Sequence, residues 1–120
     1  GDPKVVVADR GNHRLQIFTP DGVHRGFVTD GMRLPCHCDT RGDLMLIPDL
    51  QSVVTILDAD NRVAAHLGDG ADLPPLRGRP KEEFVPGKFI HPHGAKFLEN
   101  GDILVAEWVP QGRVTLLRKL

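Results

Sequence analysis

Short runs of β-branched and other apolar residues recur along the chain, and three of them end at an acidic residue. A second alternating run follows each of the three after a short polar turn. This pattern predicts pairs of short neighbouring strands rather than helices. The first runs are 4–9, 44–49 and 103–107, and the second runs are 14–18, 53–57 and 113–117.

The spacing of the acids that close the first runs indicates a repeat. Asp49 follows Asp9 by 40 residues, whereas Glu107 follows Asp49 by 58. The 18 additional residues fall in the proline-rich segment 69–90, which we predict to be a long surface loop, either a lid or a solvated connection. A period near 40 residues with about four strands per unit is typical of β-propeller blades, and a β-sandwich is the alternative.

On this basis the chain is one all-β domain, a partial β-propeller spanning 1–120, with units at about 4–28, 36–68 and 93–120. The first unit is expected to lack an innermost strand and the third an outermost one. About two and a half blades leave apolar faces and strand edges uncovered, which favours a partner. We expect self-association, as a homodimer, to complete the propeller; further chain of a longer protein is the other possibility. The predicted strands are 4–9, 14–18 and 23–28 in the first unit, 36–41, 43–49, 52–58 and 63–68 in the second, and 93–99, 102–107 and 113–120 in the third.

One stretch of the first unit resembles a known repeat. Residues 7–18, followed by Pro20-Asp21-Gly22, resemble the NHL repeat, and Asn12-His13-Arg14-Leu15 is close to its name-giving motif. The resemblance implies an NHL-type β-propeller fragment built of four-stranded antiparallel blades, with His13 in a structural role. Many NHL arrays bind other proteins, so a non-catalytic module for protein–protein interaction is one functional hypothesis.

Histidines carry the other hypothesis. His37 and His93 open predicted innermost strands, which line the channel of a propeller, so their imidazoles are expected to approach one point. Imidazole is the commonest ligand for zinc, and a catalytic zinc site takes about three protein ligands. A second copy or further blades would supply the remainder. The alternatives are that His37 is a core histidine, or that Cys36 and Cys38 form a closed Cys₂His₂ zinc site with His91 and His93.

A narrower resemblance favours a metal. His91-Pro92-His93-Gly94 resembles the Pro-His-Asp element of the peptidyl-α-hydroxyglycine α-amidating lyases, which are NHL-type propellers with zinc on three channel histidines. Segment 89–120 also resembles bacterial propellers of that type. The resemblance implies a divalent metal, Zn, held by His93 and His37. Gly94 stands where the family has Asp, and the chain has no tyrosine, a residue that the lyase site uses.

We therefore predict a metal-dependent enzyme acting on a small-molecule substrate, in which the ion activates water or a substrate oxygen. Hydrolysis of an ester or phosphoester, or an amidating-lyase-like cleavage, fits this chemistry. His91 is the candidate catalytic residue for proton transfer. Arg77 and Arg79, in the long loop, are candidates for binding an anionic substrate group. The acids at 9, 49 and 107 are expected to accept hydrogen bonds in turns.

Composition narrows the remaining classes. The chain has 15 Lys+Arg against 16 Asp+Glu and 5% aromatic residues, which argues against nucleic-acid binding. No apolar run approaches the ~20 residues of a membrane helix, so we expect a soluble protein with no membrane partner. No signal peptide is visible, and the compartment is left open. Cys36 and Cys38 are too close in sequence for an unstrained disulfide.

Overall fold

The computed structural model describes residues 3–120 and shows an all-β protein. Its two helices, η1 (Arg10–Asn12) and η2 (Lys81–Glu83), are single 3₁₀ turns. No helix among these residues has the length and apolar character needed to cross a bilayer. The strands are β1 (Val5–Asp9), β2 (Arg14–Phe18), β3 (His24–Val28), β4 (Asp39–Arg41), β5 (Leu44–Asp49), β6 (Val53–Leu57), β7 (Val63–Leu67), β8 (Pro92–Phe97), β9 (Ile103–Glu107) and β10 (Arg113–Leu117).

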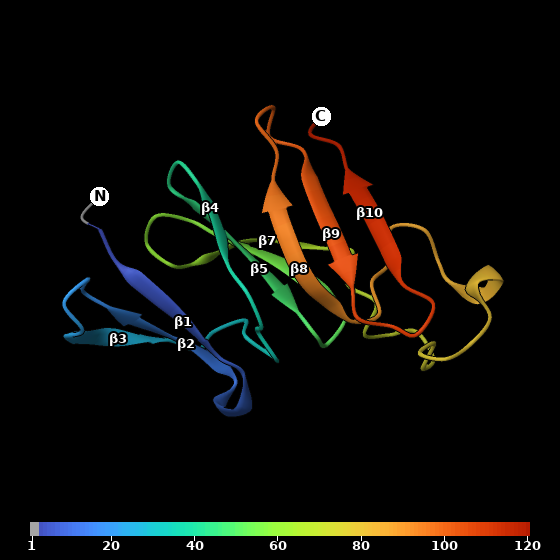
Figure 1. The fold of residues 1–120 in the computed structure, drawn as a ribbon, viewed down its shortest axis with the longest axis horizontal. Coiled ribbons are helices and arrows are strands. Elements are labelled where there is room, and N and C mark those ends of the chain that lie inside the picture. Colours follow the sequence, from blue (N-terminus) through green and yellow to red (C-terminus); the bar gives the residue numbers. More distant parts are fainter. Residues whose placement is uncertain (1–2) are drawn as a thin grey trace.

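The strands form three antiparallel sheets, each built from strands that are consecutive in the chain (Figure 1). The first sheet has the order β1-β2-β3, the middle sheet β4-β5-β6-β7 and the third sheet β8-β9-β10. Short turns join most of the neighbours, so each sheet is a simple meander. The all-β class and the antiparallel four-stranded middle unit, flanked by two three-stranded units, are confirmed.

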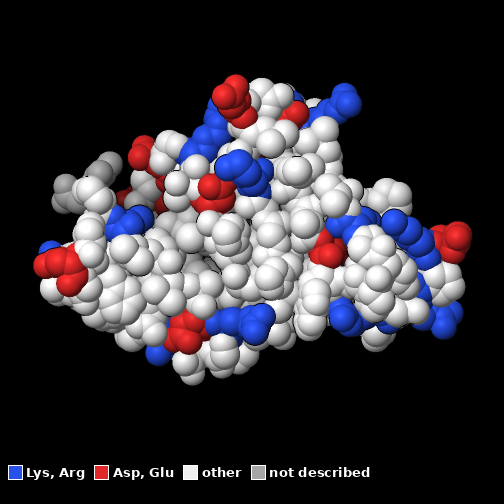
Figure 2. Space-filling view, viewed as in Figure 1, with Lys and Arg blue, Asp and Glu red and all other residues white. Residues whose placement is uncertain are grey.

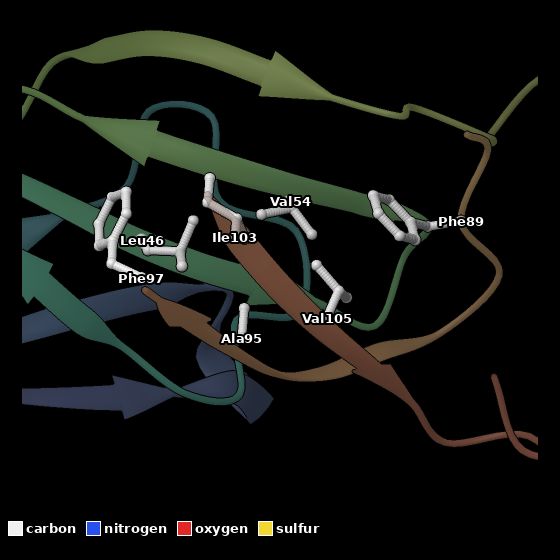
Figure 3. Packing of buried hydrophobic residues seen from close by; sticks show 7 residues of the cluster. All are labelled: Leu46, Val54, Phe89, Ala95, Phe97, Ile103 and Val105. Carbon is white, nitrogen blue, oxygen red and sulfur yellow. The ribbon is translucent and has the colours of Figure 1, made fainter. Parts of the chain in front are cut away.

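The sheets pack against one another in chain order, and the middle sheet is covered on both faces. Leu46 and Ile47 are adjacent in β5 and both fully buried, because successive side chains of a strand point to opposite faces. Ile47 packs with residues of the first sheet, whereas Leu46 packs with residues of the third (Figure 3). The first cluster holds Leu15, Val28, Met32, Met45, Ile47 and Leu57, and the second holds Leu46, Val54, Phe89, Ala95, Phe97, Ile103 and Val105.

The predicted strand 36–41 is the one whose start differs most from the structure. Only Asp39–Arg41 forms β4, and before it Pro35 makes a single isolated bridge to Asp49. Cys36 donates its backbone N–H to the carbonyl oxygen of Pro48 in β5 at 3.2 Å. Pro48 has no N–H with which to return a hydrogen bond, so regular pairing does not continue through this segment. His37 therefore lies ahead of β4 and does not open it, whereas His93 is the second residue of β8.

Two of the three acids, Asp49 and Glu107, bind backbone N–H groups of the segment that lies just before their own sheet. Asp49 accepts hydrogen bonds from the backbone N–H groups of Arg33 (2.9 Å) and Leu34 (2.8 Å). Glu107 does the same for Ile90 (2.7 Å) and His91 (3.1 Å). The predicted role of these acids as hydrogen-bond acceptors in turns is confirmed.

Asp9 differs from the other two acids because its partners are all side chains. It accepts hydrogen bonds from Asn12, Arg14 and Gln16. These contacts, led by the Arg14 hydrogen bond, lower the pKa of the Asp9 carboxyl. Within the NHL-like stretch, His13 sits in the left-handed region at φ 58°, and its Nδ1 lies 2.7 Å from the carbonyl oxygen of Arg33. That contact gives His13 a structural partner.

The long loop 69–90 is held to the rest of the fold at several points. Asp69 pairs with Arg33 at 2.6 Å, and Lys88 donates to the carbonyl oxygen of Asp69. Phe84 and Phe89 are buried, at 8% and 1% exposure. These contacts hold parts of the loop beside the third sheet, whereas most residues between 71 and 88 are exposed. The two alternatives for the loop, a lid or a solvated connection, stay predictions.

Candidate functional site

His91 is held in one orientation at the junction between the long loop and β8. Its Nδ1 lies 2.7 Å from the carbonyl oxygen of Leu50, and its own carbonyl oxygen accepts the backbone N–H of Trp108 at 2.9 Å. A carbonyl oxygen can only accept a hydrogen bond, so Nδ1 must carry the hydrogen. In the neutral ring, Nε2 is then left with its lone pair, ready to accept a proton or bind a metal.

Arg77 reaches from the loop to Trp108, the residue that follows β9. Its guanidinium carbon lies 4.5 Å from the centroid of the Trp108 ring, and Nη1 donates to the Trp108 carbonyl oxygen. Stacking on an aromatic face holds the planar guanidinium in place. None of the ion pairs formed within residues 3–120 involves Arg77, so its charge is not neutralised by an acid there.

Two adjoining hollows share His91 and Arg77 as wall residues. The smaller, about 210 Å³, lies against Ser52 and the proline-rich part of the loop. The other, about 330 Å³, lies against Leu50 and Trp108. The structure thus brings the predicted proton-transfer residue and one predicted substrate-binding residue to a single cleft, which we call the His91 cleft.

Arg79 is not part of this cleft. Its guanidinium forms two hydrogen bonds with the carboxylate of Glu83, at 2.8 and 2.9 Å, across the short helix η2. Both side chains are exposed. The loop therefore separates the two candidate substrate-binding arginines, and of the two only Arg77 lines the His91 cleft.

His93 and His37 lie on adjoining segments near the cleft. Both residues are exposed. The Cys36 sulfur lies 3.3 Å from the carbonyl oxygen of His93, which places the backbone before β4 beside the start of β8. The His93 ring centroid is 6.4 Å from that of Trp108, so His93 stands at the border of the His91 cleft. The exposure of His37 contradicts the alternative that it is a core histidine.

Residues 3–120 do not by themselves complete a metal site. No group of three or more His, Cys, Asp or Glu side chains within this range is placed to hold an ion. The closed Cys₂His₂ alternative is therefore wrong. Cys36 instead contacts main-chain oxygens, and burial raises the pKa of its thiol to about 11 and raises that of Cys38 as well. Both thiols stay protonated at neutral pH, unlike metal-bound cysteines.

Sequence reasoning missed Trp108 and the anchor of His91. Trp108 is the single tryptophan of the chain, is 60% exposed and directly follows the turn acid Glu107. Two features of the sequence could have identified Trp108 as a candidate site residue: it is a rare residue type, and it directly follows one of the acids that end the repeated strands. The anchor is a backbone oxygen of Leu50, and a main-chain group carries no signal in the sequence.

Comparison of the chain with protein-family models and with curated proteins finds no match. The resemblance to NHL repeats, which rests mainly on residues 7–22, therefore stays a prediction, as does the relation of 89–120 to the amidating lyases.

Proposed function

We propose that this chain is an arc of an NHL-type β-propeller and that the His91 cleft is the active site of a hydrolase or lyase acting on a small molecule. The observation that carries the proposal is the pairing of an oriented histidine with an unneutralised arginine around shared hollows. The packing of three meander sheets in chain order supports the propeller part.

Each residue of the cleft has a chemical role in this proposal. His91, with Nδ1–H donated to Leu50, accepts a proton at Nε2 from water or from a substrate hydroxyl. Arg77 binds an anionic group of the substrate through its remaining N–H groups. The exposed ring of Trp108 holds the guanidinium and offers an apolar surface to the substrate.

The metal part of the proposal needs a contribution from elsewhere. His37 and His93 supply two imidazoles, whereas a catalytic zinc site takes about three protein ligands. We propose that Zn²⁺ binds at these two residues only when a further ligand comes from outside residues 3–120. The roles of His91 and Arg77 do not depend on that ion.

The test of the enzyme proposal is a substrate screen on the purified chain with and without added Zn²⁺. Suitable substrates are activated carboxylic esters, a phosphodiester and a peptide ending in α-hydroxyglycine. For a substrate that is turned over, His91→Ala should lower kcat by roughly 10²–10⁴-fold, the range for loss of a general base. Arg77→Ala should mainly raise KM for anionic substrates. His24→Ala, on β3, is the matched control; equal activity in all variants would refute the assignment.

The metal is tested separately by elemental analysis and by titration with Zn²⁺ in an assay of metal binding alone. Loss of binding in both His37→Ala and His93→Ala, with binding retained in His24→Ala, would support the shared site. Binding that survives both substitutions would show that the ion sits elsewhere.

The second candidate function is a non-catalytic module that binds proteins. It is favoured by the exposed Trp108–Arg77 stack, since tryptophan and arginine dominate the binding energy of interfaces. The outer faces of the first and third sheets are also apolar, with Val5 and Phe27 exposed on one and Leu104 and Val114 on the other. We propose that a second copy covers them in a homodimer. Sedimentation tests this, and a well-dispersed monomer at high concentration would contradict it.

A further inference from the structure

The smaller hollow of the His91 cleft is bounded on one side by the loop segment 70–77, which is held at both ends. At its start, the backbone N–H of Gly70 donates to the carbonyl oxygen of Ser52 at 2.9 Å. At its end, the Arg77 side chain donates to the carbonyl oxygen of Trp108. The hollow is therefore already formed without a ligand, as ligand sites in proteins usually are.

The walls of this hollow are mainly apolar. Its apolar lining includes two parts of the chain, the loop and the segment before β8, with the residues Leu73, Pro74, Leu76, Phe89 and Ile90. The Ser52 hydroxyl in the same wall already donates to the carbonyl oxygen of Ile90 at 2.8 Å. The polar side-chain groups left for a ligand are therefore those of Arg77 and His91.

The volume of the hollow sets the size of the ligand. It is about 210 Å³, below the ~300–1,000 Å³ of pockets that take drug-sized ligands. In an engineered protein, a cavity of about 150 Å³ lined by leucine, isoleucine and phenylalanine binds benzene. The hollow therefore has room for one aromatic ring with a small substituent.

The charge around the cleft favours an anion. Among residues 3–120, no acid lines either of its two hollows. Arg77 uses Nη1 for the Trp108 carbonyl oxygen, and its other N–H groups can bind a carboxylate through two parallel hydrogen bonds. Figure 2 shows basic side chains gathered at the end of the molecule where Figure 1 places the loop 69–90. A negatively charged ligand is therefore favoured over a neutral or positively charged one.

We propose that the His91 cleft binds a small aromatic carboxylate, with its single ring in the smaller hollow and its carboxylate on Arg77. The inference rests on the function proposed above and names the substrate class of the same site. Arg77 and His91 line both hollows, so the group that is cleaved from such a substrate would extend from the ring past His91 into the larger hollow. An aryl ester that carries a carboxylate on its ring is the simplest member of this class.

The only tryptophan of the chain provides a reporter for this site, since the Trp108 ring stacks on Arg77. The full 120-residue chain, labelled with ¹⁵N, is titrated with benzoate, and the cross-peak of the indole N–H is followed by NMR. Because the chain has one tryptophan, this cross-peak needs no assignment. We expect it to shift with benzoate concentration until the site is saturated.

Two further probes separate the contribution of the charge from that of the ring. Benzamide has the same ring without the charge and should bind about fivefold more weakly or less, the loss expected for an ion pair at an exposed arginine. Acetate has the charge without the ring and should bind about tenfold more weakly or less, because it buries little apolar surface. Equal affinity for benzoate and either probe would overturn the proposal.

A pair of variants assigns the carboxylate to Arg77. Arg77→Ala should lower the affinity for benzoate to that for benzamide. Arg79→Ala is the matched control, because Arg79 lies two residues further along the loop and pairs with Glu83 outside the cleft. It should leave the affinity unchanged, and the ¹⁵N spectrum of each variant checks that it is folded. Equal effects of the two substitutions, or no saturable shift with benzoate, would also overturn the proposal.

Intermolecular NOEs between benzoate and the protein locate the ring. We expect NOEs from the ring protons to the methyl groups of Leu73 and Leu76, which line the smaller hollow. NOEs only to Leu34 and Leu50 would place the ring in the larger hollow and refute this part of the proposal. Benzoate binding without turnover in the ester screen would support this inference and count against the enzyme. Turnover of neutral esters without benzoate binding would do the reverse.

Discussion

The middle and third sheets contain the same residue at the same place in a very different environment. Leu46 and Leu104 each stand three positions before the acid that ends their strand, at Asp49 and Glu107. Leu46 is fully buried because the third sheet packs over it, whereas Leu104 is 40% exposed. The difference shows that a neighbouring sheet, rather than the strand's own sequence, determines whether this face belongs to a core.

The three acids that end equivalent strands show the same contrast between buried and exposed positions. Asp49 and Glu107 are 0% and 8% exposed and bind backbone N–H groups of the segments before β4 and β8. Asp9 is part-exposed and binds only side chains of its own turn. The same residue class thus serves as a buried fastening in two sheets and as a local turn stabiliser in the first.

The largest effect is expected for Glu107→Ala. The substitution leaves the Arg113 guanidinium, whose Nε lies 2.6 Å from Glu107 Oε1, without its buried partner, and it leaves two backbone N–H groups unpaired. Removal of one member of a buried ion pair costs about 3–5 kcal/mol. Urea unfolding should show this loss in the free energy of unfolding, and a much smaller loss for Asp9→Ala. Equal losses would mean that the two acids are not in different environments.

A smaller effect is expected at the matched leucines. Leu46→Ala should reduce the free energy of unfolding by about 2–5 kcal/mol, because it opens a cavity in the core. Leu104→Ala should change it by about 0.5 kcal/mol or less, as substitutions at open surface positions do. Thermal or urea unfolding of both variants at low protein concentration measures the difference. If Leu104→Ala proves as costly as Leu46→Ala, its face is covered in solution.

The repeat pattern was sufficient to predict the all-β class, most of the strands and their grouping into three antiparallel sheets. Nine of the ten strands lie within or close to their predicted ranges because alternating β-branched runs and turn residues are local signals. The start of β4 was predicted three residues early. Where this strand begins depends on its pairing with β5, which is limited here to the isolated bridge between Pro35 and Asp49, and the local sequence does not show that pairing. Stacking of the sheets follows from the repeat, but no local pattern shows which outer faces stay open.

The candidate site was predictable only in part. His91 and Arg77 were identified from their residue types and from their place in and after the long loop. Their approach depends on the path of that loop, which tertiary contacts such as the Arg33–Asp69 ion pair determine. The separate course of Arg79 depends on the one-turn helix η2, where its partner Glu83 lies four residues away.

The smallest effect concerns the Arg33–Asp69 pair, which is more exposed than Arg113–Glu107. The Arg33 guanidinium lowers the pKa of the Asp69 carboxyl to about 2, from an ordinary value of 3.8. Because the folded-state pKa is the lower one, the pair stabilises the fold above about pH 4, and this contribution is lost as the pH falls towards 2. Asp69→Asn should therefore lower stability at pH 7 but make little difference near pH 2. Urea unfolding at both pH values tests this, and an equal loss at both would contradict it.

The hydrogen bonds from Asp49 and Glu107 to backbone just before their own sheets also have a consequence for the evolution of such a chain by duplication of its repeats. Each acid lies 15–17 residues after the main-chain groups that it binds. This interval is shorter than the 40-residue repeat period, so acid and partners stay together when a gene segment of one period that includes the residues just before the sheet is copied or deleted. A duplicated unit would arrive with its carboxylate already satisfied. Repeat number in this architecture is therefore open to change by recombination without leaving a buried charge stranded.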